Sequence, residues 1–196
     1  MEKFNLKVIG KIQTDGSGSK LVLNKNYIKG LTNINDFSYI NIIWWFDKCD
    51  NNKSRTKLIE NSPYKNAPNL LGTFATRSPE RPNPIGLSCS YVTYVDYDNG
   101  IIGLAYIDAD NETPILDIKP YIPSLDRVEN PIMPNWCSYW PKNIEESGKF
   151  NWENVFNFWQ FNLMKEFIYF TIIIKMRQIG FYLSHKLIYG LFIKLF

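Results

Sequence analysis

The chain has 196 residues, of which 45% are hydrophobic and 16% aromatic, so it can bury the core of one domain and still carry an additional segment. Its formal net charge is +3, but residues 164–196 hold five basic side chains and one acidic side chain, which leaves seventeen basic and eighteen acidic residues, or −1, for the rest. This balance excludes a body that binds nucleic acid through a uniformly basic surface and leaves only a local basic patch open.

The N-terminal residues predict two strands joined by a flexible turn. Apolar and polar residues alternate over residues 4–12, which is typical of a half-buried strand. A turn rich in Gly and Ser follows at 15–19, and a second strand is predicted around 21–23. Residues 24–31 are predicted to form a short helix or a turn.

Residues 37–46 are a continuous apolar run between two aspartates, which predicts a buried strand. Trp44 and Trp45 in this run are expected to be core residues. The alternative is that one ring faces a bound cation, because an aromatic face attracts positive charge. Residues 48–69 are polar and rich in Asn, Lys and Ser, so we predict a loop whose composition suits mobility.

Residues 71–87 contain the most distinctive stretch of the chain. A strand pattern at 71–76 leads into a loop with three prolines, which fix their own φ angles and restrict the residues before them. Arg77 and Arg81 lie in this stiff loop, and Gly86 allows a tight turn after it. Two interpretations remain open from the residues alone: a structural crossover with solvated arginines, or a binding loop whose rigidity lowers the entropy lost on binding.

A β-hairpin is predicted next. Two apolar runs at 87–97 and 101–108 are joined by Asp98-Asn99-Gly100, a sequence that favours a type I′ turn. This arrangement puts Asp108 at the end of the second strand.

A short strand between prolines is predicted at 113–120. Asp117 and Lys119 would share one face of it, because alternate residues of a strand point the same way. They could form an ion pair that fixes the segment, or they could contact a ligand directly.

The C-terminal third has a different character. Residues 130–150 contain several Pro and Trp residues and predict an irregular strap, and apolar residues at helical spacing predict an amphipathic helix over 152–163. Residues 164–196 are apolar and basic but lack the ~18 uncharged residues of a membrane span. They could cover the body as a helix, lie on a membrane surface, or be a non-native extension from a shifted reading frame.

The cysteine and histidine content of the sequence does not favour a metal site or a redox-active site. Three widely spaced cysteines, no C-x-x-C and a single histidine predict no metal site and reduced thiols. No apolar secretory segment opens the chain, so we expect a cytoplasmic protein. The G-x-G-x-x-G fingerprint of doubly wound nucleotide-binding folds is also absent.

Three blocks resemble the TrmO/TsaA-like methyltransferases. They are Gly30-Leu31 with Phe37-Ser38-Tyr39, the loop Ala75-Thr76-Arg77-Ser78-Pro79 with Arg81-Pro82-Asn83-Pro84-Ile85-Gly86, and the segment from Asp108 to Tyr121. The blocks occur in the family's order and cover residues 5–127 roughly. Together they are far more specific than a lone glycine pattern.

The resemblance implies a mainly β fold, a closed or nearly closed β-barrel-like domain with short helices over residues 1–127. A strap and helix at 128–163 would pack on it, and the tail at 164–196 would be a helical or irregular extension. The family is usually homodimeric, binds S-adenosylmethionine and transfers its methyl group. Its best-known members methylate a threonylcarbamoyl-adenosine beside the tRNA anticodon.

The resemblance also implies site residues. The cofactor would contact Arg77, Leu87, Tyr106, Ile107, Asp108 and Lys48. Arg77 would bind its carboxylate, backbone groups near Leu87 its adenine, and Asp108 its ribose hydroxyls, or Asp108 would act as the catalytic base. We assign substrate binding to Arg81, Asn83, Asp117 and Lys119. Direct in-line methyl transfer from a sulfonium needs no metal.

The chain departs from the family pattern in three places. Tyr39 stands where the family usually has His, Glu112 where it usually has Gly, and a Pro-Arg-Gln segment after the first strand is missing. If position 112 is left-handed, the side chain there would be strained by roughly 1 kcal/mol or more. These departures keep two alternatives open: a non-catalytic S-adenosylmethionine-binding sensor or scaffold, and a methyltransferase with an acceptor other than tRNA.

Overall fold

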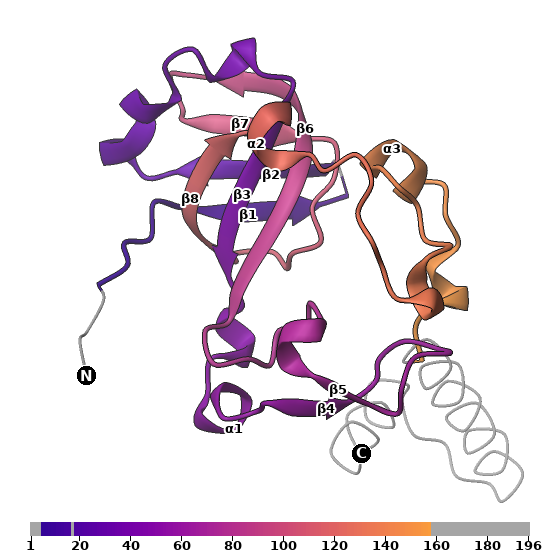
Figure 1. Ribbon diagram of the computed structural model, residues 1–196. Helices are drawn as coiled ribbons and strands as arrows, with labels where there is room; N and C mark the ends of the chain where they lie inside the picture. Colours follow the sequence, from indigo (N-terminus) through magenta and orange to yellow (C-terminus); the bar gives the residue numbers. More distant parts are fainter. Residues whose placement is uncertain (1–4, 17, 158–196) are drawn as a thin grey trace, which may run out of the picture. The chain divides into compact units, whose positions relative to one another are not determined.

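A computed structural model describes residues 5–16 and 18–157 of the chain (Figure 1). These residues divide into two compact units. The first contains the described residues up to Glu60 together with Leu71–Pro131, and the second contains Asn61–Leu70 together with the described residues from Ile132 onward. The predicted boundary at residue 127 therefore lies close to the end of the first unit.

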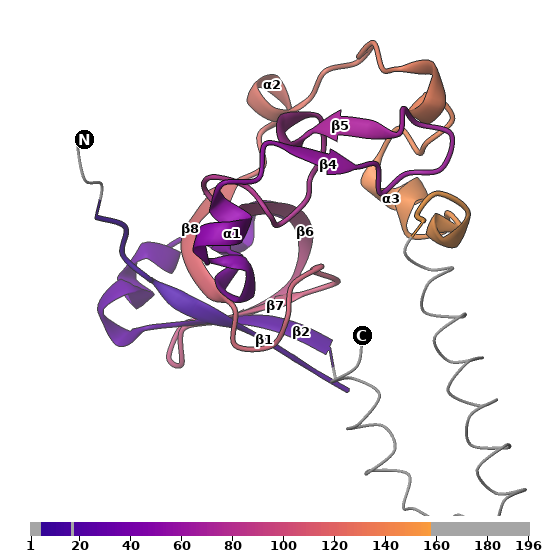
Figure 2. The ribbon, with the colours of Figure 1, turned by 90° about the horizontal axis from the view of Figure 1, so that it is seen from below.

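The first unit is built on a closed antiparallel barrel with the strand order β1-β2-β7-β6-β3-β8. Its strands are β1 (Gly10–Asp15), β2 (Gly18–Leu23), β3 (Tyr39–Trp45), β6 (Ile85–Asp96), β7 (Ile101–Leu104) and β8 (Pro114–Pro120). Figure 2 shows the strands curving round a ring. The predicted mainly β, barrel-like fold is confirmed.

Short elements connect and extend the barrel. The helical turns of the first unit are η1 (Lys25–Leu31), η2 (Ile34–Asp36), η3 (Asp47–Cys49), α1 (Asn52–Arg55), η4 (Thr73–Ala75) and α2 (Pro123–Asp126). Strands β4 (Ile59–Asn61) and β5 (Leu70–Gly72) pair with each other in a separate two-stranded sheet. The segment 48–69, predicted as a loop, thus contains a helical turn and a strand.

The barrel core is aliphatic and follows from the alternation of the strands. In β3 every second residue is buried, so Ile40, Ile42 and Trp44 point inward and the residues between them point outward. The prediction of a strand buried on both faces was wrong, because a barrel strand has one face outside. Trp44 is a core residue, whereas the Trp45 ring lies outside, where its Nε1 donates to Asp50.

Gly86 is required where β6 crosses Trp44. A Cβ at this position would lie 2.3 Å from the Trp44 ring, well inside van der Waals contact. The sequence predicted a tight turn at this glycine. The structure instead places it within a strand whose backbone passes close to the Trp44 indole.

The β6–β7 hairpin is present, but its turn differs from the prediction. Asp96 pairs with Ile101, so four residues form the loop, and only Gly100 among them has a positive φ, of 67°. A type I′ turn needs positive φ at both central residues, so that prediction was wrong. Strand β7 ends at Leu104, which leaves Asp108 in the following loop and not at a strand end.

Two further boundaries differ from the sequence pattern. Strand β1 begins at Gly10, where pairing with β2 and β8 starts, and the preceding Leu6 and Val8 are exposed. The strand predicted at 71–76 ends at Gly72 and continues as the turn η4. Short apolar runs do not show where pairing partners end.

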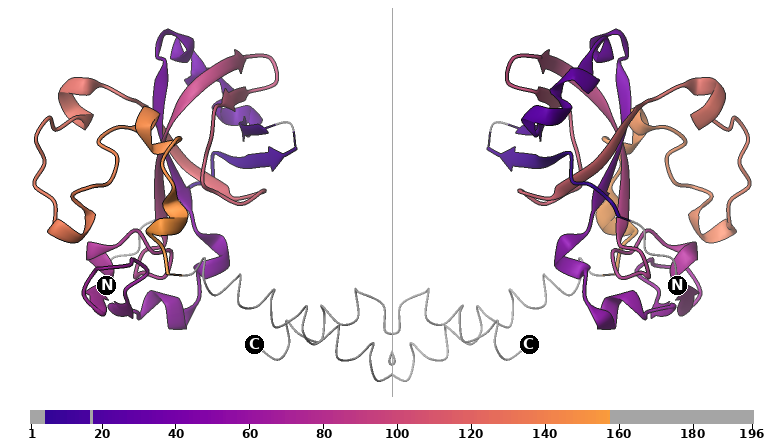
Figure 3. Two further views of the ribbon diagram at one scale, coloured as in Figure 1. Left: turned by 90° about the vertical axis from the view of Figure 1, so that its right-hand side faces the viewer. Right: turned by 90° about the vertical axis from the view of Figure 1, so that its left-hand side faces the viewer.

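The described part of the second unit consists of turns and loops, with η5 (Asn135–Cys137), α3 (Ile144–Ser147) and η6 (Trp152–Asn154) (Figure 3). Of the helix predicted over 152–163, the structure describes 152–157, where η6 is a single turn. Residues 158–163 and the tail at 164–196 lie outside the described residues. No helix among the described residues is long and apolar enough to cross a bilayer.

Candidate functional site

Residues 73–84, here called the hook, connect β5 to β6 and contain both arginines of the distinctive loop. The Arg81 guanidinium donates to the backbone carbonyls of Ser78 at 2.7 Å, Thr76 at 2.7 Å and Thr73 at 3.1 Å. Three contacts from one planar side chain draw the hook into a compact turn. Arg81 therefore holds the backbone of the hook, and its contact with substrate stays a prediction.

Arg77 is arranged differently. Its side chain is exposed, and one Nη donates to the carbonyl of Leu87 at 2.5 Å. Among the predicted cofactor residues, Arg77 and Leu87 are the only two that a hydrogen bond joins directly in the described part of the chain. The other guanidinium nitrogens of Arg77 remain open for a second partner such as a carboxylate.

A buried polar group fixes the base of the hook. Glu60 is 9% exposed and accepts a hydrogen bond of 2.7 Å from the hydroxyl of Thr76, the residue before Arg77. Lys57 lies 3.6 Å from Glu60 and bonds closely to Glu80, within the hook. The hydrogen bond with Lys57 lowers the pKa of Glu80, and the same contact raises the pKa of Lys57. Both charges are thus retained at neutral pH.

Sequence reasoning missed this group because the segment 48–69 looked like a loop. The one available signal was the spacing of Lys57 and Glu60, three residues apart. Arg55 adds a further contact, donating to the carbonyl of Pro82 at 3.1 Å. These residues position the hook and do not form a site of their own.

The loop after β7 brings the next predicted residues to the barrel end. Tyr106 is 69% exposed, and its carbonyl accepts a hydrogen bond of 2.7 Å from the buried Ser90 hydroxyl. Ile107 is 4% exposed and belongs to the barrel core, so its side chain cannot line an exposed site. Asp108 is exposed and forms no hydrogen bond or ion pair within residues 5–16 and 18–157.

Ion pairs tie the same loop to the barrel. Lys48 and Asp110 pair at 2.7 Å, and this hydrogen bond raises the pKa of Lys48. Glu112 has a φ of 69° and pairs with Lys11 at 2.5 Å. Position 112 is therefore left-handed, as expected if Gly is the usual residue, and the Glu side chain there is used in a surface contact.

The predicted pair on β8 is an ion pair. Lys119 and Asp117 lie 2.7 Å apart on the outer face, so of the two possibilities left open by the sequence the fold supports mutual pairing. Asn83 is exposed, and no hydrogen bond to its side chain is seen in the described part of the chain. At the position usually held by His, the Tyr39 ring packs edge-on against Tyr91, with centroids 5.4 Å apart, and against Tyr121 at 6.4 Å.

An exposed apolar row runs along β6 beside Arg77. Ile85, Leu87 and Tyr91 point outward and are 40%, 50% and 46% exposed. Exposed side chains of this size on one strand face are typical of a surface that contacts a ligand or another chain. The first unit thus carries an exposed guanidinium bound to the Leu87 carbonyl, an apolar row on β6 and an exposed carboxylate at Asp108.

Comparison with known proteins gives this arrangement a family. The sequence model of the tRNA-methyltransferase O N-terminal domain matches residues 9–127, which include the hook and the loop around Asp108. A probable S-adenosyl-L-methionine-binding protein of Methanocaldococcus jannaschii is 38% identical over 124 residues, covering 63% of this chain and 96% of that protein. The human tRNA (adenine(37)-N6)-methyltransferase is 38% identical over 104 residues, covering 53% of this chain and 22% of that protein.

The fold agrees with this match. A crystal structure of TrmO superimposes with a TM-score of 0.54 and 25% identity over 67% of this chain and 64% of the TrmO chain. This chain therefore spans less than two thirds of the solved TrmO and about a fifth of the human enzyme. The matched region is the barrel with its hook, and the chain belongs to the family of tRNA-methyltransferase O N-terminal domains.

Proposed function

We propose that this protein is an S-adenosylmethionine-dependent methyltransferase that acts on tRNA. The family match over residues 9–127 is the observation that carries the proposal. Relatives named as S-adenosyl-L-methionine-binding proteins and as tRNA methyltransferases support the cofactor and the substrate.

The residues of the first unit suit this cofactor. Arg77 has donors left for its carboxylate, and the exposed Leu87 offers an apolar contact beside backbone groups that can bind adenine. The Asp108 carboxylate is exposed and can accept hydrogen bonds from ribose hydroxyls. Lys48 pairs with Asp110, two residues after Asp108, and its contact with the cofactor stays a prediction.

Methyl transfer depends mainly on the alignment of the acceptor nitrogen, the methyl carbon and the sulfur. S-adenosylmethionine supplies a methyl carbon already activated by a sulfonium. The acceptor nitrogen bonds to that carbon while the sulfur leaves with the bonding pair, and the nitrogen then gives up its proton. In this chain the hook holds Arg77 in place through Arg81 and Glu60, and Asp108 is the candidate to take the proton.

Calorimetry with S-adenosylmethionine tests the cofactor. We expect binding by the wild type and a Kd at least tenfold weaker for Arg77→Ala, because charge-assisted hydrogen bonds contribute about 1.5–3 kcal/mol. Arg127→Ala is the matched control, since Arg127 is an exposed arginine whose one ion pair among the described residues is with Glu129. No heat at millimolar ligand would defeat the proposal.

The finer proposal is N-methylation of threonylcarbamoyl-adenosine beside the anticodon. Mass spectrometry of tRNA nucleosides from a deletion strain would show loss of the methylated form, and complementation would restore it. An unchanged level would reject this acceptor. Wild-type protein that binds S-adenosylmethionine but transfers no methyl group to any tRNA pool would instead favour the sensor or scaffold, which the departures at Tyr39 and Glu112 make a real alternative.

We also propose a homodimer in the cytoplasm. Ile85 and Tyr91, which are exposed on either side of the cofactor residue Leu87 in β6, are the surface that a second copy would cover. Sedimentation of Tyr91→Glu should show a shift towards monomer, while Val128→Glu, at another exposed apolar position, should leave the dimer intact. A wild type that sediments as a monomer at all concentrations would reject the dimer.

A further inference from the structure

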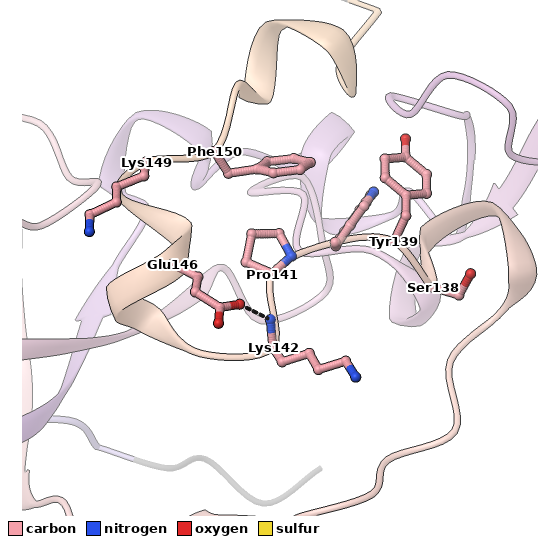
Figure 4. Close-up of a pocket in the computed structure, with 8 residues that line it drawn as sticks. Ser138, Tyr139, Pro141, Lys142, Glu146, Lys149 and Phe150 are labelled. Carbon is pink, nitrogen blue, oxygen red and sulfur yellow. Dashed lines mark hydrogen bonds between the residues drawn. The ribbon is translucent and has the colours of Figure 1, made fainter.

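The second unit contains an open pocket of about 570 Å³ that the methyltransferase site does not use. It is lined by Ser138, Tyr139, Trp140, Pro141, Lys142, Glu146, Lys149 and Phe150. Figure 4 shows the rings of Tyr139, Pro141 and Phe150 along one side and Lys142 and Lys149 at the outer edges. All of these residues come from one short segment, so the pocket is complete within the unit.

A cluster of aromatic rings holds the pocket in shape. Trp152 packs edge-on against Phe150, with centroids 4.9 Å apart, and against Trp140 at 5.6 Å. The Trp152 indole also donates to the carbonyl of Ser147 at 3.1 Å, which fixes the end of α3. A pocket wall that is ordered before binding loses less entropy when a ligand arrives.

Some polar groups of the pocket have hydrogen-bond partners among the described residues and others do not. The Glu146 carboxylate accepts a hydrogen bond of 3.4 Å from the backbone N–H of Lys142. The ammonium groups of Lys142 and Lys149 form no ion pair with any carboxylate of the described residues. Trp140 carries a buried indole N–H that has no acceptor within the described residues. The pocket therefore has free cations and an unused donor around an aromatic wall.

Tyr139 supplies the surface on which a flat ligand could stack. Its side chain is 51% exposed, and its ring contact is with Phe150 at 6.4 Å, so one face is left open. An open aromatic face in a pocket edged by two lysines that have no ion pair among the described residues matches a nucleotide, whose base stacks and whose phosphate carries negative charge.

We propose that this pocket binds one nucleotide of the RNA substrate, with its base on Tyr139 and the neighbouring backbone phosphates at Lys142 and Lys149 on the edges of the pocket. The identity of the RNA rests on the proposed function, but the nucleotide chemistry rests on the pocket alone. A local contact of this kind also fits a body whose charges nearly cancel, since phosphate binding then has to come from a few placed lysines.

Fluorescence anisotropy with a short labelled single-stranded RNA and with total tRNA tests the pocket. Tyr139→Ala should weaken binding about tenfold, the effect typical of losing one stacked base, and Tyr139→Phe should restore it. Lys142→Ala with Lys149→Ala should raise the Kd and reduce the slope of log Kd against log salt by about one to two, because two phosphate contacts are lost.

The controls separate this pocket from general charge and from the cofactor site. Lys25→Ala with Lys29→Ala removes the same charge from exposed positions on the barrel and should leave the Kd within about twofold. Calorimetry with S-adenosylmethionine on the pocket variants should match the wild type. If the wild type binds RNA through the pocket but not S-adenosylmethionine, the proposed function fails and this site stands.

Two results would overturn the inference. One is wild-type RNA affinity in both Tyr139→Ala and the double-lysine variant, with melting curves that show both to be folded. The other is a proline-rich peptide that binds the wild type and loses affinity in Tyr139→Ala, with no RNA binding at all, since an aromatic pocket of this kind could also receive a polyproline helix.

Discussion

The barrel wall formed by β3 and β6 is held together differently from the hook, which leads directly into β6. The wall is stabilised by buried aliphatic side chains and a continuous antiparallel ladder. The hook has no ladder; Arg81 gathers its carbonyls, and Glu60 and Lys57 fix its base. We infer that substitutions in the wall change stability alone, whereas substitutions in the hook change both stability and the position of Arg77.

The largest expected effect lies in the wall. Ile42 is fully buried, so Ile42→Ala should lower the free energy of unfolding by about 2–5 kcal/mol through lost burial and the cavity left behind. Urea unfolding measures this change. Ile43→Ala, on the outer face of the same strand, is the matched control and should cost clearly less. Equal losses at the two positions would contradict the alternation.

The next largest effects are expected at the two arginines of the hook, and they should differ in kind. Arg81→Ala should lower the free energy of unfolding by about 2 kcal/mol and also weaken S-adenosylmethionine binding, because its charged hydrogen bonds hold the hook. Arg77→Ala should weaken binding while its melting temperature stays near that of the wild type, since Arg77 is exposed. Arg81→Ala protein with wild-type stability would break the distinction between holding and binding.

A smaller effect should depend on pH. Lys57 lowers the folded pKa of Glu80 from its ordinary value of 4.5, so the carboxylate stabilises the hook above that value and loses this effect as the pH falls through the folded pKa. The wild type should therefore be more stable than Glu80→Gln at pH 7, and the difference should vanish well below pH 4.5. Thermal unfolding of both proteins across this range measures it. A difference that persists in acid would point to packing and not to charge.

The smallest effect is expected at Glu112. Replacing it by Gly relieves a left-handed backbone, a gain of about 1 kcal/mol, but removes an exposed pair with Lys11 that contributes about 0–1 kcal/mol. The net change in unfolding free energy should be small and in favour of Gly. Glu112→Ala loses the pair and keeps the strain, so it should be the least stable of the three.

The sequence predicted much of the wall and little of the hook's internal structure. Apolar residues bounded by turn residues or prolines located β2, β6 and β8. This pattern misjudged β3, whose outer face also carries apolar residues. The alternation of side chains along a strand does not predict which strands will pair with it.

The hook shows the other limit. Arg77 and Arg81 are equivalent in the sequence, because a guanidinium can bind a backbone carbonyl as readily as a ligand. Glu60 and Thr76 meet across sixteen residues, a contact that only the fold creates. The resemblance to a family located the loop, and the fold separates Arg81, which binds carbonyls within the hook, from Arg77, which is exposed and reaches the Leu87 carbonyl on β6.

The joint that closes the barrel is narrow. Gly10 and Lys11 are the residues of β1 in register with β8, opposite Ile115 and Pro114, and the N–H groups of Ile9 and Ile12 add hydrogen bonds to the carbonyls of Ile115 and Thr113. This contact is shorter than the pairing of β3 with β6, which runs over seven residues. Amides on this side of β1 should therefore exchange with solvent deuterium sooner than those between β3 and β6. Since the N–H of Glu112 donates to Ile12 at this joint, opening of the barrel there would release one end of the loop that also carries Asp108, the candidate base.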